Sequence, residues 1–433
     1  MLKSLGRRRA VRTLAHVGAI AGMLAGTLMV STAALADTTV HWLHLEQNPP
    51  IVAYWRQVAD EYEKAHPGVK IDMQYLENEA YKAKLTTLLQ SKSAPDIIYS
   101  WGGGVLDEQI KAGVIKDITA DVDKSYSDQF NPTFWTAFNR DGKQWGIPHL
   151  ASEVAFFYNK PLMQKAGVDP TTIKTWDDFL AAVKKIKAAG ITPIIAGGAD
   201  KWPLHFYWSD LALRIGGEQA FKDAMAGKGD GFASQTFVKA GEMMKQLTDL
   251  QPFQPGYLGA TAPDAYGQFG DGKGAMELMG DWLYTSQKSG AANGKGISDA
   301  DLGMMEFPAV KNGAGKPTDT LGGVNGWLVT KNAPPETVDF LKFFVTLDHE
   351  RYMANHGFFI PVMKGASDEM QNPIYKKIAD DLTHSTYHQI FYDQFLGPNV
   401  GRVVNDVTTD LASGATTPKE AAQAVQDAWA MEH

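Results

Sequence analysis

The sequence predicts an α/β protein built on mainly parallel sheets that are flanked by helices. Segments with strand-like alternation are followed by segments with helical spacing of their apolar residues, and this order recurs from residue 40 onward. The 397 residues after a predicted signal peptide also suffice for two domains, each with its own core. In sheets of this kind, ligands bind beyond the carboxyl ends of the strands.

The first elements alternate regularly between strand and helix. The first helix places Ile51, Trp55 and Val58 on one face, and Pro67-Gly68 stops it. Polar and aromatic residues follow the strands, as a polar uncharged ligand would require. The predicted elements are strands at 40–45, 69–76 and 97–99 and helices at 51–65 and 81–90, and the strand ends lie at 44–47, 76–78 and 100–101.

The second part of the chain contains longer helices and two candidate crossings between domains. Thr175 caps a helix that carries Asp177 and Asp178 in its first turn and lysines near its end. An extended run at 153–158 fits a strand that crosses between domains, and 358–362 is a second candidate. The other predicted elements are a mainly helical stretch at 219–251, an extended piece at 272–279, a strand at 328–330, a helix at 335–345 and a helix that opens near 398.

The first 36 residues have the features of a cleavable signal peptide. A basic start precedes an apolar run from 17 to 35, and Ala34-Leu35-Ala36 is a small-x-small cleavage site. The alternative is an uncleaved membrane anchor, which the Gly- and Ala-rich run does not favour. Arg8-Arg9 leaves the twin-arginine and general export routes both open. Since the chain has no cysteine for a lipid anchor, we expect a periplasmic protein that begins at Asp37.

The composition excludes several classes of function. Without cysteine there are no disulfides, no thiol catalysis and no Cys-ligated metal. The residues after the signal include 36 of the 41 basic residues and all 49 acidic residues, so the mature chain carries a net formal charge of −13. An acidic surface without a basic stripe argues against binding to nucleic acid or to anionic lipid. No segment after the signal is apolar for long enough to span a membrane.

Tryptophan is abundant, with 11 residues, and several sit beside turn residues. Trp101 precedes three glycines, Trp202 precedes a proline, and Trp282 follows Gly280-Asp281. An indole at such a position presents a flat apolar face, on which the C–H face of a sugar ring can stack, while sugar hydroxyls need carboxylate and amide partners. The tryptophans assigned instead to the core are Trp55, Trp135, Trp176 and Trp429.

Eight short motifs occur in one order over nearly all of residues 37–433, and in this they resemble the extracellular solute-binding proteins of carbohydrate-uptake ABC transporters, the maltose-binding-protein-like family. The resemblance implies a two-lobed periplasmic binding protein fold that closes on a sugar at a hinge. The motifs are YEKAHPGVKI at 62–71, APDII at 94–98, AGVIKDI at 112–118, FYNK at 157–160, TWDDF at 175–179, GAM at 274–276, GDW at 280–282 and GG at 322–323.

The resemblance also implies domain boundaries, a function and partners. The N-terminal lobe would comprise 37–149 and about 301–348, and the C-terminal lobe 150–300 and about 349–433. The protein would be a monomeric receptor without enzyme activity or cofactor. It would capture an oligosaccharide of two to four units and deliver it to the ABC permease in the inner membrane. The identity of the sugar and its linkage stay open.

The candidate ligand-binding residues combine the strand ends with the positions that the resemblance implies. Trp101, with Ser100 as a rival one residue earlier, and Trp282 would stack on sugar rings, and Glu153 would lie at the first crossing. Either Asn325 or Trp327 would face the ligand after Gly322-Gly323. The complete set is Glu46, Gln47, Glu77, Asn78, Trp101, Glu153, Trp202, His205, Trp208, Asp281, Trp282, Gly323, Asn325, Trp327 and Asn399.

Other interpretations stay open for single residues and for the whole protein. Trp202 or Trp208 could be buried by an amphipathic helix, and Glu46 or Asn78 could be ordinary caps. An exported glycoside hydrolase would need two carboxylates about 5–9.5 Å apart, which Glu46, Glu77, Glu153 and Asp281 could supply. A metal receptor is the third class, but His349 and His356, seven residues apart, suit a structural role as well.

Overall fold

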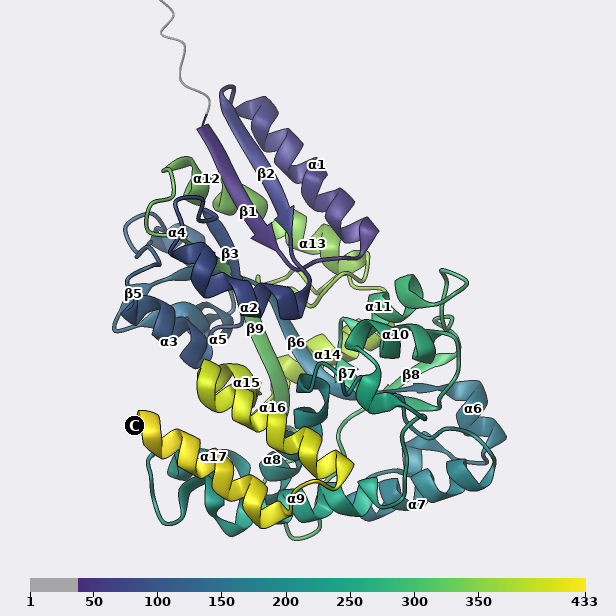
Figure 1. Cartoon of the computed structure of the whole chain (residues 1–433). Helices are drawn as coiled ribbons and strands as arrows, with labels where there is room; N and C mark the ends of the chain where they lie inside the picture. Colours follow the sequence, from purple (N-terminus) through teal and green to yellow (C-terminus); the bar gives the residue numbers. More distant parts are fainter. Residues whose placement is uncertain (1–37) are drawn as a thin grey trace, which may run out of the picture. The chain divides into compact units, whose positions relative to one another are not determined.

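The computed structural model describes residues 38–433, so the predicted signal peptide lies outside the described residues. Strands and helices alternate through this range, which confirms the predicted α/β class (Figure 1). No helix within residues 38–433 is both long and apolar enough to cross a membrane.

The strands of the described chain form one large mixed sheet in the order β2-β1-β3-β9-β6-β7, with β10 paired to β9 and β8 paired to β6. The strands are β1 (Thr38–His44), β2 (Val69–Tyr75), β3 (Ile97–Ser100), β6 (Gly146–Asn159), β7 (Met276–Gly280), β8 (Leu302–Met305), β9 (Thr320–Val329) and β10 (His388–Ile390). A separate pair consists of β4 (Asn139–Arg140) and β5 (Lys143–Gln144).

The prediction of mainly parallel sheets is only partly correct. β1 is parallel to β2 and β3, and β10 is parallel to β9. β9, however, is antiparallel to both β3 and β6, and β6 is antiparallel to β7 and β8. The early βαβ pattern correctly indicated the parallel strands, whereas the direction of β6 and β9 depends on partners that are distant in the sequence.

The long strand β6 changes partners along its length. Its first half, up to Glu153, pairs with β9, and its second half, from Val154, pairs with β7 and β8. The predicted strand at 153–158 is therefore confirmed, but it begins earlier, at Gly146, where a side chain would meet Leu328 of β9 at 2.5 Å. The segment of the second candidate crossing, 358–362, contains no strand, and Ile360 makes an isolated bridge to Ala151 of β6.

The helices agree with most of the predicted ones. Thr175 caps α7, as predicted, and Asp178 completes a reciprocal capping box with it. The long helices are α1 (Pro49–Ala65), α2 (Asn78–Leu89), α7 (Trp176–Ala188), α8 (Trp202–Met225), α9 (Gln235–Thr248), α14 (Pro373–His384), α16 (Pro398–Ser413) and α17 (Pro418–Glu432). The shorter ones are α3 (Gly103–Lys111), α4 (Lys124–Ser127), α5 (Pro132–Trp135), α6 (Lys160–Lys165), α10 (Ala262–Gly270), α11 (Leu283–Gly290), α12 (Glu336–Phe344), α13 (Leu347–Asn355) and α15 (Tyr392–Phe395).

The core beside β1 is unusually aromatic. The ring of Trp42 stacks on Trp55 at 5.3 Å and meets the edge of Trp327 at 5.2 Å, and Phe340 and Phe344 of α12 close the cluster. These rings are fully or nearly fully buried. The cluster packs β1, β9, α1 and α12 against one another.

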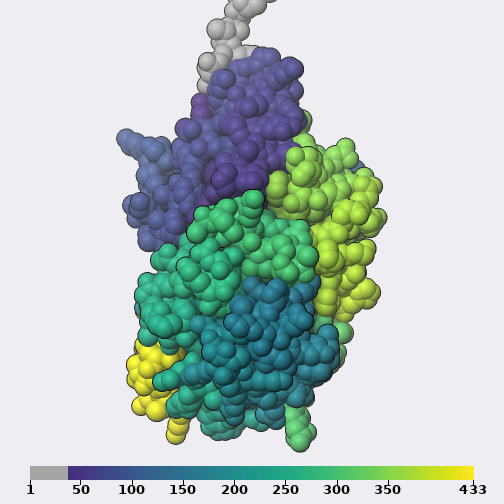
Figure 2. Space-filling model, turned by 90° about the vertical axis from the view of Figure 1, so that its right-hand side faces the viewer, coloured from purple at the N-terminus to yellow at the C-terminus, as the bar shows by residue number. Residues whose placement is uncertain are grey.

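The chain segments also keep to separate parts of the surface. In the face shown in Figure 2, the purple N-terminal segments adjoin the teal and green middle segments along a boundary, and the yellow-green residues near the end of the chain border both.

The loops after the parallel strands β1, β2 and β3 lie at one edge of the sheet, because parallel strands end on the same side.

Candidate functional site

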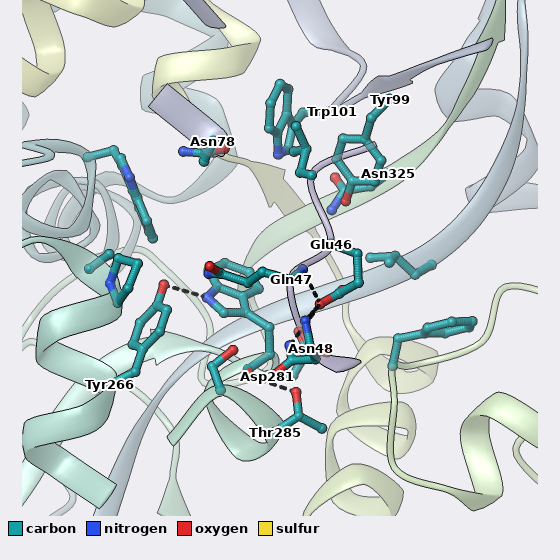
Figure 3. A pocket seen from close by; sticks show the side chains of 18 of the residues that line it. Glu46, Gln47, Asn48, Asn78, Tyr99, Trp101, Tyr266, Asp281, Thr285 and Asn325 are labelled. Carbon is teal, nitrogen blue, oxygen red and sulfur yellow. Dashed lines mark hydrogen bonds between the residues drawn. The ribbon is translucent and has the colours of Figure 1, made fainter. Parts of the chain in front are cut away.

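A cavity of about 200 Å³ lies at the carboxyl ends of β1, β2 and β3 (Figure 3). On one side it is lined by the loops after these strands and by Asn325 of β9. On the other side it is lined by residues 200–206 at the start of α8, 262–266 of α10, 281–286 around the start of α11 and 391–394 of α15. The site predicted at the strand ends therefore coincides with a cavity.

The loop after β1 is organised by the carboxylate of Glu46. One oxygen, Oε1, accepts hydrogen bonds from the backbone N–H groups of Gln47 (2.9 Å) and Asn48 (2.7 Å) and from the side-chain amide of Asn48 (2.8 Å). Burial raises the pKa of Glu46 despite these bonds. Asn48 in turn accepts a hydrogen bond from Ser289, at 2.6 Å, which ties the loop to the end of α11. Oε1 of Glu46 thus holds the backbone of this part of the cavity wall, and Oε2 takes part in none of these three hydrogen bonds.

The loop after β2 also has a carboxylate that both organises the local backbone and lines the cavity. Glu77 caps α2, because its Oε2 accepts from the N–H groups of Glu79 (2.9 Å) and Ala80 (3.1 Å). The Asn78 side chain donates to Glu79 at 2.7 Å. Glu77 is therefore the N-cap of α2 and lines the cavity as well, whereas Asn78, for which capping was an alternative, is the first residue of the helix.

Trp101 lies directly after β3 and is held by its neighbours through edge contacts. Its ring meets Tyr81 at 5.9 Å and Tyr99 at 5.2 Å, both at steep interplanar angles, and the Lys82 ammonium lies 5.5 Å from its centre. The glycines that follow have a structural reason. A side chain at Gly103 would meet the Phe395 backbone at 2.8 Å, so glycine allows α3 to approach α15.

On the opposite wall, Trp282 and Trp202 form a second aromatic group. The Trp282 indole N–H donates to the hydroxyl of Tyr266 at 3.0 Å, and its ring lies 6.2 Å from Trp202 and 6.1 Å from Phe391. Gly280 makes room for this indole, since a side chain there would meet its ring at 2.0 Å. The Gly-Asp-Trp motif is thus explained by packing: the glycine lets the tryptophan fold back over the end of β7.

Asp281, which precedes Trp282, is buried and lines the cavity. Its backbone N–H donates to the carbonyl of Glu153 at 3.1 Å, and its Oδ1 accepts from the N–H of Glu153 at 3.3 Å. Burial raises the pKa of Asp281 to about 7. Asp281 therefore joins the cavity to β6 at the residue where that strand changes partners.

Asn325 lines the cavity, whereas Trp327 does not. Both lie on the same face of β9, two residues apart. At Trp327 that face is covered by Trp42 and Trp55, and the residue is fully buried. At Asn325 the cover ends, and its Oδ1 is buried without a hydrogen-bond partner among the described residues.

Ten of the fifteen predicted residues line the cavity. They are Glu46, Gln47, Glu77, Asn78, Trp101, Trp202, His205, Asp281, Trp282 and Asn325. The structure does not bring Glu153, Trp208, Gly323, Trp327 or Asn399 into its lining.

Each of the residues outside the lining has another environment. Glu153 is buried behind Asp281, and burial raises its pKa well above the usual range. Trp208 is fully buried and donates to the carbonyl of Phe237 at 3.0 Å, so the helix-core alternative describes it. Gly323 leaves room for the ring of Phe391, 2.6 Å from where a side chain would begin. Asn399 is exposed and donates to Glu432 at 2.6 Å.

Sequence reasoning missed residues on both walls of the cavity. Asp200 accepts a hydrogen bond from the N–H of Ala262, the first residue of α10, at 2.7 Å, and burial raises the pKa of Asp200. Asp393, also missed, lies 3.8 Å from Nε2 of the predicted residue His205, and burial lowers the pKa of His205. The main residues missed are Asn48, Lys82, Tyr99, Asp200, Phe206, Tyr266, Phe359, Phe391, Asp393 and Gln394. Only the aromatic character of 391–395 gave a sequence signal.

The cavity offers binding groups rather than a metal site. Within residues 38–433 there is no group of three His, Asp or Glu side chains with the geometry to hold a metal ion. Five carboxylates line the cavity, from Glu46, Glu77, Asp200, Asp281 and Asp393, against one ammonium, from Lys82. This balance disfavours an anionic ligand.

Comparisons with known proteins agree with this geometry. Residues 47–348 match the family model of bacterial extracellular solute-binding proteins. An ABC transporter extracellular-binding protein from Pyrococcus horikoshii is 25% identical over 388 residues, covering 85% of this chain and 82% of the relative. A structure from work on xylan utilization by the thermophilic bacterium Caldanaerobius polysaccharolyticus is similar with a TM-score of 0.83 and 25% identity, over 90% of this chain and 99% of that one. A chitin oligosaccharide binding protein is similar in fold, with a TM-score of 0.82 and 23% identity, over 92% and 99%.

Proposed function

This chain belongs to the bacterial extracellular solute-binding protein family, and we propose that it captures a neutral oligosaccharide and delivers it to the permease of an ABC-type importer. Members of the family are transport receptors rather than enzymes, which removes the glycoside hydrolase alternative. The observation that carries the proposal is the pairing of tryptophans on opposite walls, Trp101 on one and Trp202 with Trp282 on the other, around buried polar groups. The similar structures, a chitin oligosaccharide binding protein and one from work on xylan utilization, support the same ligand class.

The walls are suited to the two kinds of surface on a sugar. Indole faces remove C–H surface from water, and each stacked ring contributes roughly 0.5–1.5 kcal/mol beyond area burial. Carboxylate and amide oxygens such as those of Asn325 and Asp281 accept from hydroxyl groups. A ligand without the matching hydroxyl leaves a buried acceptor unpaired, which costs about 1–3 kcal/mol. Shape and hydrogen bonding together would select one sugar.

We also propose that the chain forms two lobes that close on the ligand. The exchange of partners along β6 at Glu153 supports a boundary between the lobes there. The chain would return to the N-terminal lobe along β9, which pairs with the first half of β6. Because β8, at 302–305, pairs with the second half of β6, the return into the N-terminal lobe would come within β9 rather than at about 301. A ligand that touches both walls binds the closed state better, so it shifts the population toward the form that the permease recognises.

Calorimetric titration of the chain from Asp37 onward tests the function. The panel consists of xylose, N-acetylglucosamine, glucose and galactose, together with their β- and α-linked oligomers, and each sugar is checked for turnover afterwards. We expect one series to bind saturably and to be recovered unchanged. If no member of the panel binds to folded protein, the carbohydrate proposal is wrong.

A further inference from the structure

A second and larger cavity, of about 910 Å³, adjoins the first. The two cavities share the lining residues Lys82, Trp101, Asp200, Asp393 and Gln394. The second is bounded by α2 and α3 on one side and by residues 199–201 and α16 on the other. It has more than four times the volume of the first, and the two meet at the ring of Trp101.

We propose that this second cavity binds the continuation of the sugar chain, so that the ligand runs from the first cavity past Trp101 into the space between α2, α3 and α16. The inference rests on the proposed function and adds to it the direction and length of the ligand. The first cavity, at about 200 Å³, is smaller than the roughly 300–1,000 Å³ of ordinary small-molecule pockets. An oligosaccharide that occupied it alone would therefore leave most of the available space unused.

The lining of the second cavity has the mixed character that a sugar chain needs. Leu85 and Leu89 of α2 and Val105 of α3 give an apolar strip. Gln109 of α3 is about nine-tenths buried, and its Oε1 has no hydrogen-bond partner within residues 38–433. Asn405 of α16 donates to Asp393 at 3.3 Å, and its Oδ1 likewise has no partner in the described chain. Two unpaired acceptors beside an apolar strip match hydroxyl donors beside C–H faces.

The charges in the second cavity favour a neutral chain. Lys201 and Arg402 both pair with Asp406, at 2.7 and 2.9 Å, so the cations at the α16 end are partly neutralised. Five carboxylates and three cationic groups line the cavity in total. An anionic chain would therefore meet net negative charge along its path.

Trp101 is the group that both parts of the chain would share. Tyr81 and Tyr99 hold its ring by edge contacts, and Tyr81, whose hydroxyl donates to the carbonyl of Tyr99 at 2.5 Å, also lines the second cavity. Lys82 lies near the rings of both Trp101 (5.5 Å) and Trp202 (5.8 Å). A chain that passes between the cavities would run along this ammonium, which can donate to its hydroxyl groups.

Neighbouring threonines on α2 give a matched test. Thr86 and Thr87 are both exposed, but only Thr86 lines the second cavity. The Thr86→Trp variant would obstruct the second cavity, while Thr87→Trp makes the same chemical change outside it. Both variants and the unsubstituted protein are titrated with the oligomers, from one to six units, of the sugar series that binds.

For the unsubstituted protein we expect the Kd to fall with chain length, by about fivefold to tenfold for each unit that gains one hydrogen-bonded contact. Thr86→Trp should lose this gain and keep the Kd of the shortest ligand, and Thr87→Trp should behave like the unsubstituted protein. A Kd that does not change with chain length, or a Thr86→Trp variant that matches Thr87→Trp, would overturn the inference and leave the proposed function intact. If no sugar of any length binds, the proposed function fails first and the inference fails with it.

Discussion

Replacing Trp282 by alanine should weaken sugar binding by about 60-fold. A tryptophan side chain offers about 150–250 Å² of contact area. Trp282 is already partly covered by Trp202, Phe391 and Tyr266, so we take about 100 Å² as the area left for a ligand. At about 25 cal/mol per Å², this area contributes about 2.5 kcal/mol, which corresponds to about 60-fold in Kd.

The assay is calorimetric titration with the sugar that binds most tightly, together with thermal denaturation of each variant. The control is Trp145→Ala, which removes a partly buried tryptophan that lies outside both cavities. The loss of the hydrogen bond to Tyr266 lowers the stability of Trp282→Ala as well, so the titration is made well below its Tm. A folded Trp282→Ala protein with a Kd within about twofold of the Trp145→Ala value would refute the reasoning.

Three further outcomes separate binding from folding. Trp327→Ala should lower the free energy of unfolding by about 3–5 kcal/mol, because it opens the cluster with Trp42 and Trp55. The Kd of the folded variant should stay unchanged. A rise in Kd as large as that of Trp282→Ala would contradict the core role of Trp327. Asn325→Ala should weaken binding about tenfold by removing a buried acceptor, whereas Gln371→Ala at an exposed site should not, and equal titrations would contradict this. Asp281→Asn should become stabilising relative to the unsubstituted protein as pH rises from about 4 to above 7. The folded pKa of Asp281, about 7, lies above the unfolded value of 3.8, so the unsubstituted native state loses stability across this range. Urea unfolding measures the difference in unfolding free energy between the two proteins, and an equal difference at pH 5 and pH 8 would disprove the prediction.

The local features of the sequence predicted much of one wall of the site. The strand ends at 44–47, 76–78 and 100–101 were predicted to be polar and aromatic, and most of these residues line the cavity. The prediction succeeded because parallel strands joined by helices end on the same side of a sheet, and this rule needs no knowledge of distant contacts. The Gly-Asp-Trp motif was recognised for a similar reason, since its glycine, aspartate and tryptophan act within three residues.

The other wall could not be predicted in the same detail. Asp200, Tyr266 and Asp393 come from three segments that have no strand-end or motif signal, and they meet only when α8, α10 and α15 pack together. The mixed direction of the sheet has the same origin, since β9 lies between β3 and β6 although it follows them by more than 160 residues.

The pair Asn325 and Trp327 shows where the two kinds of information divide. By itself the sequence named Asn325 and Trp327 as rival candidates after Gly322-Gly323 and predicted a strand only at 328–330. In the structure that strand, β9, begins at Thr320 and places both residues on one face. Only the tertiary structure decided that Trp42 and Trp55 cover that face at Trp327 and leave it open at Asn325. Burial depends on what packs against a residue from elsewhere in the chain, so the sequence named the two candidates and the fold selected the residue that can meet a ligand.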